Sequence, residues 1–377
     1  MDFYETINLH GVGAKTQEEF IDFSKFMSTI QKSRLKEKDK NKRCFICKKK
    51  NKDVCNSHTI PRFVLKNIAK DGKLNNTQIF NSAKLIKNES GINNTHTFHS
   101  ICKNCDNTIF KEYETPENLE NEPTQKIMKQ IALKNHISRF NKHNEEKKLY
   151  NHILKDFKNF QSGEVVAHFV KQILPVTEHN YCYNRKRANA ILKALSTDTK
   201  LYKLCYYKKL NHVVPFSIQA NSILSLGFND ELLANTFEFT DFDNVDDIHF
   251  CIYPLKSQTV IFIFCSVDMN IYDNFFNILK EKNTAEQLSI LNFISFAYFE
   301  DIYLHQQLDS SILNNSHLQK LTQEQMMAIS NQSNVKHLSV KEREKLKLGS
   351  LNKNFSIINH TKIPNLLDEQ YKVNTSL

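Results

Sequence analysis

The chain has 377 residues, which is enough for two or three domains of about 150 residues each. Its 40% hydrophobic and 24% charged residues exclude a wholly disordered chain, and only 7 glycines and 7 prolines exclude a collagen-like one. The longest apolar run, around residues 260–267, is far shorter than the ~20 residues that span a bilayer, so no membrane partner is expected. The N-terminus lacks the basic and apolar regions of a secretory signal, which predicts a cytoplasmic protein.

The positive charge is concentrated in one part of the chain. Residues 1–150 hold 28 basic and 18 acidic side chains, which is the whole formal net charge of +10. Residues 32–52 are the most basic, with eleven Lys or Arg against two acidic residues. Such a segment attracts a polyanion such as nucleic acid. The charge alone is equally consistent with an ordinary solvent-exposed surface that binds no polyanion.

Residues 1–40 are predicted to form an N-terminal helix. Between residues 17 and 36 the apolar side chains recur at helical spacing on one side. This helix is expected to pack against a neighbouring element or a second copy of the chain.

The cysteines predict a structural metal. Their number, nine, is odd, which disfavours a disulfide framework. Two Cys-x-x-Cys motifs, formed by Cys44 with Cys47 and by Cys102 with Cys105, can present four thiolates and complete a tetrahedral Zn²⁺ shell. The alternative is two unrelated pairs of buried thiols. Cys55 is a competing ligand, although packing as a small hydrophobe is favoured for it.

The residues between and after these motifs carry a resemblance. The first stretch is Cys55-Asn-Ser-His58-Thr-Ile-Pro61, and the second motif continues as Cys105-Asp106-Asn107. Over about residues 40–118, this order resembles the HNH, or ββα-metal, nucleases. The resemblance implies a hairpin and a helix held by a zinc clamp, a hairpin histidine acting on water as general base, and a divalent ion beside the helix.

Carried over to this sequence, the resemblance assigns the general base to His58. It assigns ligation of a catalytic Mg²⁺ or Mn²⁺ to Asp106 and Glu114, with Asn107 as a further ligand or a positioning group. The simpler alternatives are a zinc-ligating or surface histidine at position 58 and, at position 106, an acidic residue favoured by the helix dipole.

Two positions depart from the family pattern. Ser57 stands where an Asp or His usually helps to hold the metal, and Thr97 stands where the middle Asn is usual; His96 or His99 could substitute for the latter. Hydrolysis of a phosphodiester needs a base, a cation and a grip on the backbone phosphates. The candidates for the phosphate contacts are Lys48, Lys49, Lys50, Arg62 and Lys103.

The rest of the chain predicts further helices and strands. The insert after His58 is expected to hold a short helix at 63–68 and a strand or hairpin at 75–86. Two helices, about 124–140 and 145–160, would form a helical connector. Later apolar runs predict an antiparallel hairpin at 248–253 and 259–267, followed by helices at 271–282 and 285–304.

The predicted fold class is α+β, with a zinc-clamped ββα module followed by a separate mixed domain that contains an antiparallel sheet. The predicted boundaries are 1–40 for the N-terminal helix, 41–118 for the nuclease module, 119–160 for the connector, 161–330 for the α+β domain and 331–377 for a polar tail. The domain at 161–330 is expected to serve regulation, recognition or dimerisation.

The predicted function is an HNH-type endonuclease acting on double-stranded DNA, although phosphate contacts alone do not separate DNA from RNA. Fusion to an unfamiliar second domain resembles bacterial restriction or phage-defence effectors. The alternatives are a non-catalytic zinc-clamped nucleic-acid-binding protein, which Ser57 and Thr97 favour, and a zinc-dependent protein-interaction module, which the charge disfavours.

Overall fold

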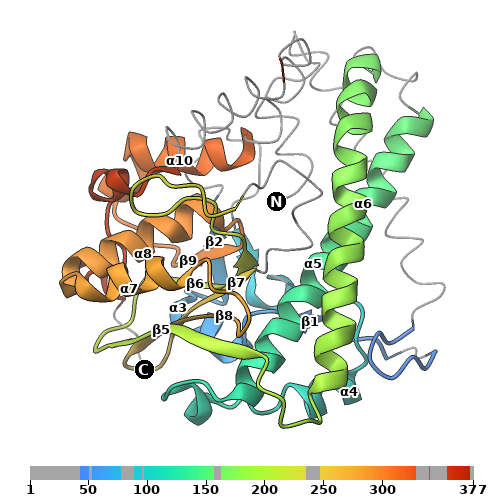
Figure 1. The fold of residues 1–377 in the computed structure, drawn as a ribbon, viewed down its shortest axis with the longest axis horizontal. Coiled ribbons are helices and arrows are strands. Elements are labelled where there is room, and N and C mark those ends of the chain that lie inside the picture. The colour runs from blue at the N-terminus through green and yellow to red at the C-terminus, as the bar shows by residue number, and fades with distance from the viewer. Residues whose placement is uncertain are drawn as a thin grey trace.

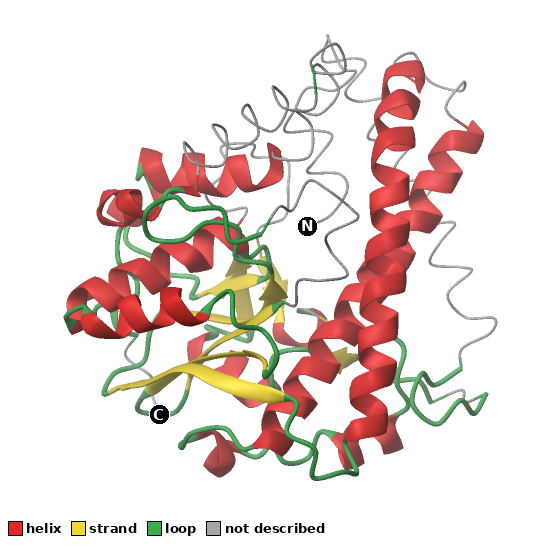
Figure 2. Ribbon diagram, viewed as in Figure 1, coloured by secondary structure: helices red, strands yellow, loops and turns green. Residues whose placement is uncertain are grey.

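The computed structural model describes residues 43–50, 53–77, 89–95, 97–156, 163–234, 247–327, 339 and 355–373. The fold is mixed α+β, as predicted, with helices on both sides of a central antiparallel sheet (Figures 1 and 2). The helix predicted within residues 1–40 lies outside the described residues, as does His96. Among the helices of the described residues, none combines the length and apolar character needed to cross a membrane.

The central sheet has seven strands in the order β3-β2-β9-β6-β7-β8-β5, and every neighbouring pair is antiparallel. The predicted hairpin at 248–253 and 259–267 is confirmed as its β7 and β8. The strands are β2 (Lys73–Asn76), β3 (Glu89–Gly91), β5 (Tyr202–Leu210), β6 (Phe216–Ser222), β7 (Ile248–Pro254), β8 (Thr259–Ser266) and β9 (Ile302–Leu304).

Both faces of this sheet are covered, which explains why β7 is buried along its whole length. Side chains alternate between the two faces of a strand. Phe250 and Ile252 belong to the core on one face, and Cys251 and Tyr253 belong to the core on the other. Antiparallel strands usually alternate between apolar and polar residues because one face of the sheet is exposed to solvent. The continuous apolar runs in this sequence therefore reflect a sheet with protein on both sides.

The first two strands of the sheet come from an early part of the chain. β2 and β3 lie in the insert between His58 and the second cysteine motif, and β2 pairs with β9 through Asn75 opposite Leu304. The sheet thus crosses the boundary predicted between residues 118 and 161. The cysteine module, by which we mean the described part of residues 43–118, and the later strands share one continuous structure.

Helices cover the face of the sheet that carries Phe250 and Ile252. They are α7 (Asp273–Glu281), α8 (Thr284–Tyr298), α9 (Ser310–Leu313) and α10 (Ser316–Met327). The predictions of α7 and of the start of α8 are confirmed, whereas the predicted helix end at residues 302–304 is wrong because these residues form β9. α8 is mostly apolar and is buried on all sides from Ile290 to Ala297, which is typical of an enclosed helix. The segment 355–373, with the short 3₁₀ turns η7 (Ile357–Lys362) and η8 (Glu369–Tyr371), covers the outer side of α8.

This last segment differs from the predicted polar tail, because part of it packs into the core. Leu366 and Leu367 are fully buried. The buried amide of Asn292 on α8 donates to the Pro364 carbonyl at 2.9 Å and accepts from the Leu366 N–H at 3.0 Å. These bonds satisfy a polar side chain that the core would otherwise leave unpaired.

Two long helices lie on the opposite side of the molecule (Figure 1). The prediction of two helices at 124–140 and 145–160 is wrong, because α5 runs without a break from Gln125 to Asp156. The polar stretch around residues 141–147 contains neither Gly nor Pro and continues the helix. α6 (Gly163–Ala194) lies alongside α5.

We expect Leu366→Ala to lower the free energy of unfolding by about 3 kcal/mol, because it removes a fully buried side chain and leaves a cavity. The matched control is Ile358→Ala, in the same segment, whose side chain is 79% exposed and whose loss should change stability by less than about 0.5 kcal/mol. Urea unfolding of both variants measures the difference. Equal losses of unfolding free energy in the two variants would contradict the packing of residues 355–373 against α8.

Candidate functional site

The two cysteine motifs meet in space. The sulfur atoms of Cys44, Cys47, Cys102 and Cys105 all lie within 4.8 Å of one another. For Zn–S bonds of about 2.3 Å, a tetrahedral site needs sulfur atoms roughly 3.8 Å apart. The Sγ atoms of Cys47 and Cys102 are 3.9 Å apart, so the four cysteines fit a structural metal such as zinc.

The local backbone favours this arrangement. The first motif lies on a tight turn in which the Lys48 N–H donates to the Cys44 carbonyl at 2.9 Å. A hydrogen bond from the backbone of Lys49 lowers the pKa of the Cys47 thiol to about 7, which favours its thiolate, whereas burial raises the pKa values of Cys44 and Cys105. In the second motif, the Cys102 N–H points to Cys44 Sγ at 3.4 Å.

Cys55 is not part of this group. Its thiol donates to the Ile101 carbonyl at 3.3 Å and to Asp106 Oδ2 at 3.6 Å. Burial and the nearby Asp106 charge raise the pKa of Cys55 to about 12, so it stays a protonated thiol. It packs as a small side chain beside the candidate site, as the sequence favoured.

A short strand pair and a helix stand next to the four cysteines. β1 (Ser57–His58) pairs antiparallel with β4 (Thr97–Phe98), with His58 opposite Thr97. α4 (Lys103–Ile109) begins inside the second cysteine motif and carries Asp106 in its first turn. The described residues therefore contain a strand pair and a helix, as the resemblance implied.

His58 is held in a defined orientation. Its Nε2 lies 2.9 Å from the Ile92 carbonyl oxygen, in the 3₁₀ turn η2 (Ile92–Asn94). A carbonyl only accepts, so this contact requires a hydrogen on Nε2, and Nδ1 is then the nitrogen that can take a proton. Burial lowers the pKa of His58 below its ordinary value, and the charges of Lys134 and Arg62 act in the same direction against the Ile92 hydrogen bond.

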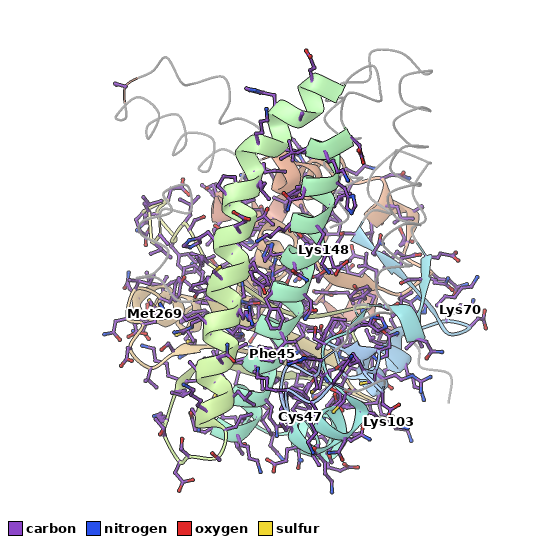
Figure 3. All side chains as sticks on the ribbon, turned by 90° about the vertical axis from the view of Figure 1, so that its right-hand side faces the viewer. Phe45, Cys47, Lys70, Lys103, Lys148 and Met269 are labelled. Atoms are coloured by element: carbon purple, nitrogen blue, oxygen red, sulfur yellow. The ribbon has the colours of Figure 1, made fainter. Side chains whose placement is uncertain are left out.

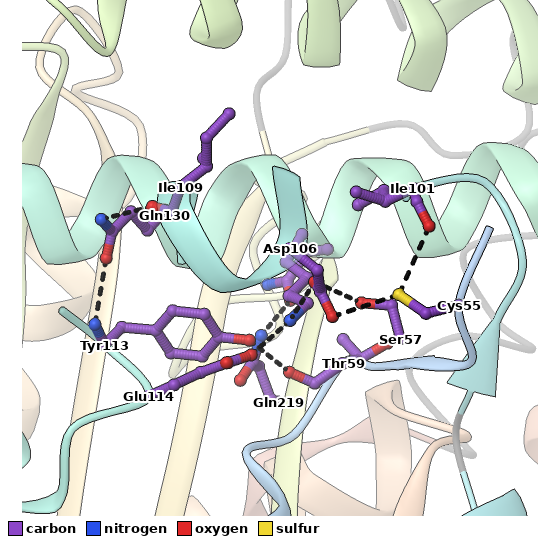
Figure 4. A network of polar contacts seen from close by, with 12 residues as sticks. Cys55, Ser57, Thr59, Ile101, Asp106, Ile109, Tyr113, Glu114, Gln130 and Gln219 are labelled. Carbon is purple, nitrogen blue, oxygen red and sulfur yellow. Dashed lines mark hydrogen bonds and ion pairs between the residues drawn. The ribbon is translucent and has the colours of Figure 1, made fainter. Parts of the chain in front are cut away.

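Asp106 is the centre of a polar cluster (Figure 4). The Ser57 hydroxyl, next to His58 on β1, donates to Asp106 Oδ1 at 2.7 Å. Ser57 stands where the family usually has an Asp or His that holds the metal, and in this structure it orients the Asp106 carboxylate instead.

Lys134 is the residue of this cluster that sequence reasoning missed. Its ammonium lies 3.1 Å from Asp106 Oδ1 and 2.5 Å from Glu114 Oε1, and its side chain is 0% exposed. The rings of Phe110 and Tyr113 add cation–π contacts at 4.4 and 5.3 Å. Lys134 comes from α5, 20 residues after Glu114, in a helix that has no motif of its own. No local signal distinguishes it from the other lysines of α5.

Further contacts fasten this cluster to α5. Gln130 accepts from the Tyr113 N–H at 3.0 Å and donates to the Ile109 carbonyl at 2.6 Å (Figure 4). The Tyr113 hydroxyl donates to the Thr59 carbonyl at 3.0 Å, directly after His58. The loop that carries Glu114 therefore has a fixed position between β1 and α5.

The remaining predicted site residues lie apart from this cluster. Asn107 is on the exposed side of α4, and His99 lines a separate cavity described below. Arg62, at the start of α3 (Arg62–Ile68), donates to Asn93 Oδ1 at 2.8 Å. Its charge lowers the pKa of His58. Lys48, Lys49, Lys50 and Lys103 are all exposed, and Lys103 is labelled in Figure 3 beside Cys47.

The chain matches no protein-family model, no curated protein and no solved structure. A relationship to the HNH nucleases therefore stays a prediction from the motifs.

We expect the purified chain to hold one zinc ion and Cys102→Ser to lose it, since three thiolates and a hydroxyl bind Zn²⁺ less strongly than four thiolates. Elemental analysis of the dialysed protein measures the metal content. Cys55→Ser is the control, and it should keep the zinc because Cys55 lies outside the cluster. Loss of zinc in both variants would show that the ligand set is different.

We expect Lys134→Met to lower the free energy of unfolding by about 3 kcal/mol, because Asp106 and Glu114 would lose the buried cation between them. Lys126→Met is the matched control on the same helix. Lys126 pairs with Glu112, but its side chain is 56% exposed, so the loss should stay below about 1 kcal/mol. Chemical denaturation compares the two, and similar losses would rule out a special role for the buried ammonium.

Proposed function

We propose that the cysteine module is an HNH-type endonuclease that hydrolyses phosphodiester bonds in double-stranded DNA, with His58 as the general base. The observation that supports this most is the orientation of the His58 imidazole. The Ile92 carbonyl engages Nε2 at 2.9 Å, which leaves Nδ1 to accept a proton from water.

The protonation state of His58 suits this role. A general base must be neutral before it acts, and the lowered pKa keeps the imidazole neutral at pH 7. After Nδ1 takes the proton of the attacking water, the Ile92 carbonyl still accepts from Nε2, so the ring need not turn. Asp106 is close enough to raise the pKa of His58, and its charge would stabilise the imidazolium that forms.

The donor set also fits one divalent ion, Mg²⁺ or Mn²⁺, on Asp106. Among the described residues, Asp106 Oδ2 accepts only the Cys55 thiol at 3.6 Å, which is a weak donor that an ion can displace. Mg²⁺ commonly uses one or two carboxylates and completes its shell with water and substrate phosphate. Such an ion, when bound, would stabilise negative charge that develops on the phosphate and on the leaving oxygen.

Glu114 suits a different role from the predicted one. Its Oε1 pairs with Lys134 at 2.5 Å, and a divalent ion between Glu114 and Asp106 would meet the ammonium. We therefore assign Glu114 to holding Lys134, and Lys134 to holding Asp106. Lys134 is a positioning residue because its side chain is 0% exposed and cannot touch a substrate, and Glu114 is one because it acts through Lys134.

Exposed basic residues around the module would supply the phosphate contacts. Arg62 influences the pKa of His58, so we assign it to the phosphates nearest the cleaved bond. Lys48, Lys49, Lys50 and Lys103 extend the positive surface. A role in restriction or phage defence, a cytoplasmic location, and a second copy or regulatory partner bound through residues 161–330 stay predictions.

The second candidate function is a zinc-clamped protein that binds nucleic acid without cutting it. The pairing of Lys134 with both acidic residues favours it, because two of the predicted oxygen ligands already have a cation. A binder of this kind would show affinity that falls steeply with salt and would leave the strands intact.

We expect purified protein to nick plasmid DNA with Mg²⁺ or Mn²⁺, and His58→Ala to slow cleavage by about 10²–10⁴-fold, which is the usual contribution of a general base. His317→Ala is the control, since His317 lies on the exposed surface of α10. Gel analysis of plasmid forms gives the rates. DNA binding without any cleavage would support the second candidate function.

The pH dependence provides a further check of the same base. The pKa of His58 is lowered from its ordinary value of 6.5, so the rate should stay constant from neutral pH down past 6.5. Below the lowered pKa the imidazole is protonated, and the rate should fall tenfold per pH unit. A rate that already falls between pH 8 and pH 7 would contradict His58 as the base.

A further inference from the structure

A large cavity lies apart from the cluster around Asp106. Its volume is about 1160 Å³, and it is bordered by the first cysteine motif, β4, the middle of α5, α6 and β6. His58, Asp106 and Glu114 are not among its lining residues, whereas the predicted site residues His99 and Lys48 are. Figure 3 labels two of its side chains, Phe45 beside the lower part of α5 and Lys148 higher on that helix.

The lining of this cavity is basic. It holds six basic side chains against two acidic ones, although Lys142 pairs with Glu300 and Lys148 pairs with Glu145. The remaining excess of positive charge raises the local concentration of an anion that carries several charges. The acidic ones are Glu145 and Asp301; the basic ones are Arg43, Lys48, Arg139, Lys142, Lys148 and Arg185.

Aromatic rings stand beside these charges. The Phe45 and Phe140 ring centroids are 4.8 Å apart, and Tyr181 lies at the edge of Phe140 at 6.3 Å. The guanidinium of Arg185 lies 5.8 Å from the Tyr181 ring. Planar rings and a guanidinium face are the groups on which a nucleobase stacks.

Buried amide side chains form a third part of the lining. Asn135, Gln219 and Asn221 are at most 4% exposed. Within the described residues, two oxygen atoms of lining side chains, Thr59 Oγ1 and Asn221 Oδ1, have no hydrogen-bond partner. A buried oxygen without a partner is unfavourable, and a donor on a bound molecule would satisfy it.

We propose that this cavity binds a small phosphorylated nucleoside, either a nucleotide or two linked nucleotides. The basic residues would hold the phosphates, the rings would stack on the base, and the unpaired oxygens of Thr59 and Asn221 would accept from its amino or hydroxyl groups. Pockets for small molecules are typically about 300–1,000 Å³, so this cavity has room for two nucleotides. A duplex keeps its bases paired in its interior and could not reach the buried amides.

The cavity borders the strand that pairs with the candidate catalytic strand. Thr97 lines it, and Thr97 is the register partner of His58. An occupied cavity would therefore contact the strand pair that carries the base. This consequence rests on the proposed function, whereas the binding of the ligand does not.

Calorimetric titration of the full chain tests the binding. The probes are ATP, the linear dinucleotide pApA, inorganic pyrophosphate and a 20-base-pair duplex. We expect ATP or pApA to bind clearly more tightly than pyrophosphate. The double variant Lys148→Glu, Arg185→Glu should weaken this binding by roughly tenfold or more, because two attractive charges at the cavity become repulsive.

The control is Lys155→Glu, Lys186→Glu, which makes the same charge change at exposed positions of α5 and α6 outside the lining. It should leave the affinity within about twofold. The proposal is overturned if neither nucleotide binds at millimolar concentration, if pyrophosphate binds as tightly as they do, or if both double variants lose affinity equally. It is also overturned if only the duplex binds and loses affinity in the cavity variant, because the cavity would then belong to the nucleic-acid surface.

His58→Ala separates this proposal from the nuclease. That variant should bind the nucleotide as the original chain does, because His58 does not line the cavity. Nucleotide binding without any cleavage by the original chain would leave the cavity assignment standing and reject the nuclease, and cleavage without nucleotide binding would do the reverse.

Discussion

The structure depends on one helix segment that is enclosed on every side and still carries polar side chains. Every residue of α5 from Ile127 to Ile137 is buried, including Lys129, Gln130, Lys134 and Asn135. Polar groups in such a place are tolerated only when they are paired. Lys129 donates to two backbone carbonyls at and just after the end of α6, Gln130 bonds the end of α4 and the loop after it, and Lys134 pairs with two carboxylates. Asn135 bonds His249 and Gln219 on the sheet. Each partner comes from a different part of the chain, so these bonds determine where those parts lie.

The enclosed segment makes the cysteine module dependent on the rest of the protein. Its Tyr113 and Glu114 take their positions from Gln130 and Lys134, and its strand β2 completes the sheet through β9. A metal bound by the four cysteines would join the turn at residues 44–48 to the start of α4, but it cannot supply the cation beside Asp106. The candidate site therefore includes a residue from beyond the predicted module. Any function of that site is coupled through packing to the sheet and to α5.

The same helix, α5, contributes side chains to two sites of different chemistry. On one side, Lys134 fixes the Asp106 carboxylate next to His58, in a cluster whose acidic and basic groups are paired. On the other side, Asn135 and Arg139 face a cavity in which basic side chains outnumber acidic ones. The paired cluster suits acid–base chemistry, and the basic cavity suits recognition of an anion. One helix with two faces thus supports a proposed catalytic site and a proposed ligand site at once.

The sequence by itself determined the features that depend on neighbours along the chain. Cys-x-x-Cys spacing predicts the metal ligands, the turn at residues 255–258 between two apolar runs predicts the β7–β8 hairpin, and helical periodicity predicts α7 and α8. Only the tertiary structure decided the rest. Lys134 looks like any other lysine of α5 until burial places it between two carboxylates, and the basic cavity gathers Arg43, Lys148 and Arg185 from three distant segments. The apparent tail residues 366 and 367 are core because they cover α8. The physical reason is the same in each case: burial and charge pairing act through space between residues that no local pattern relates.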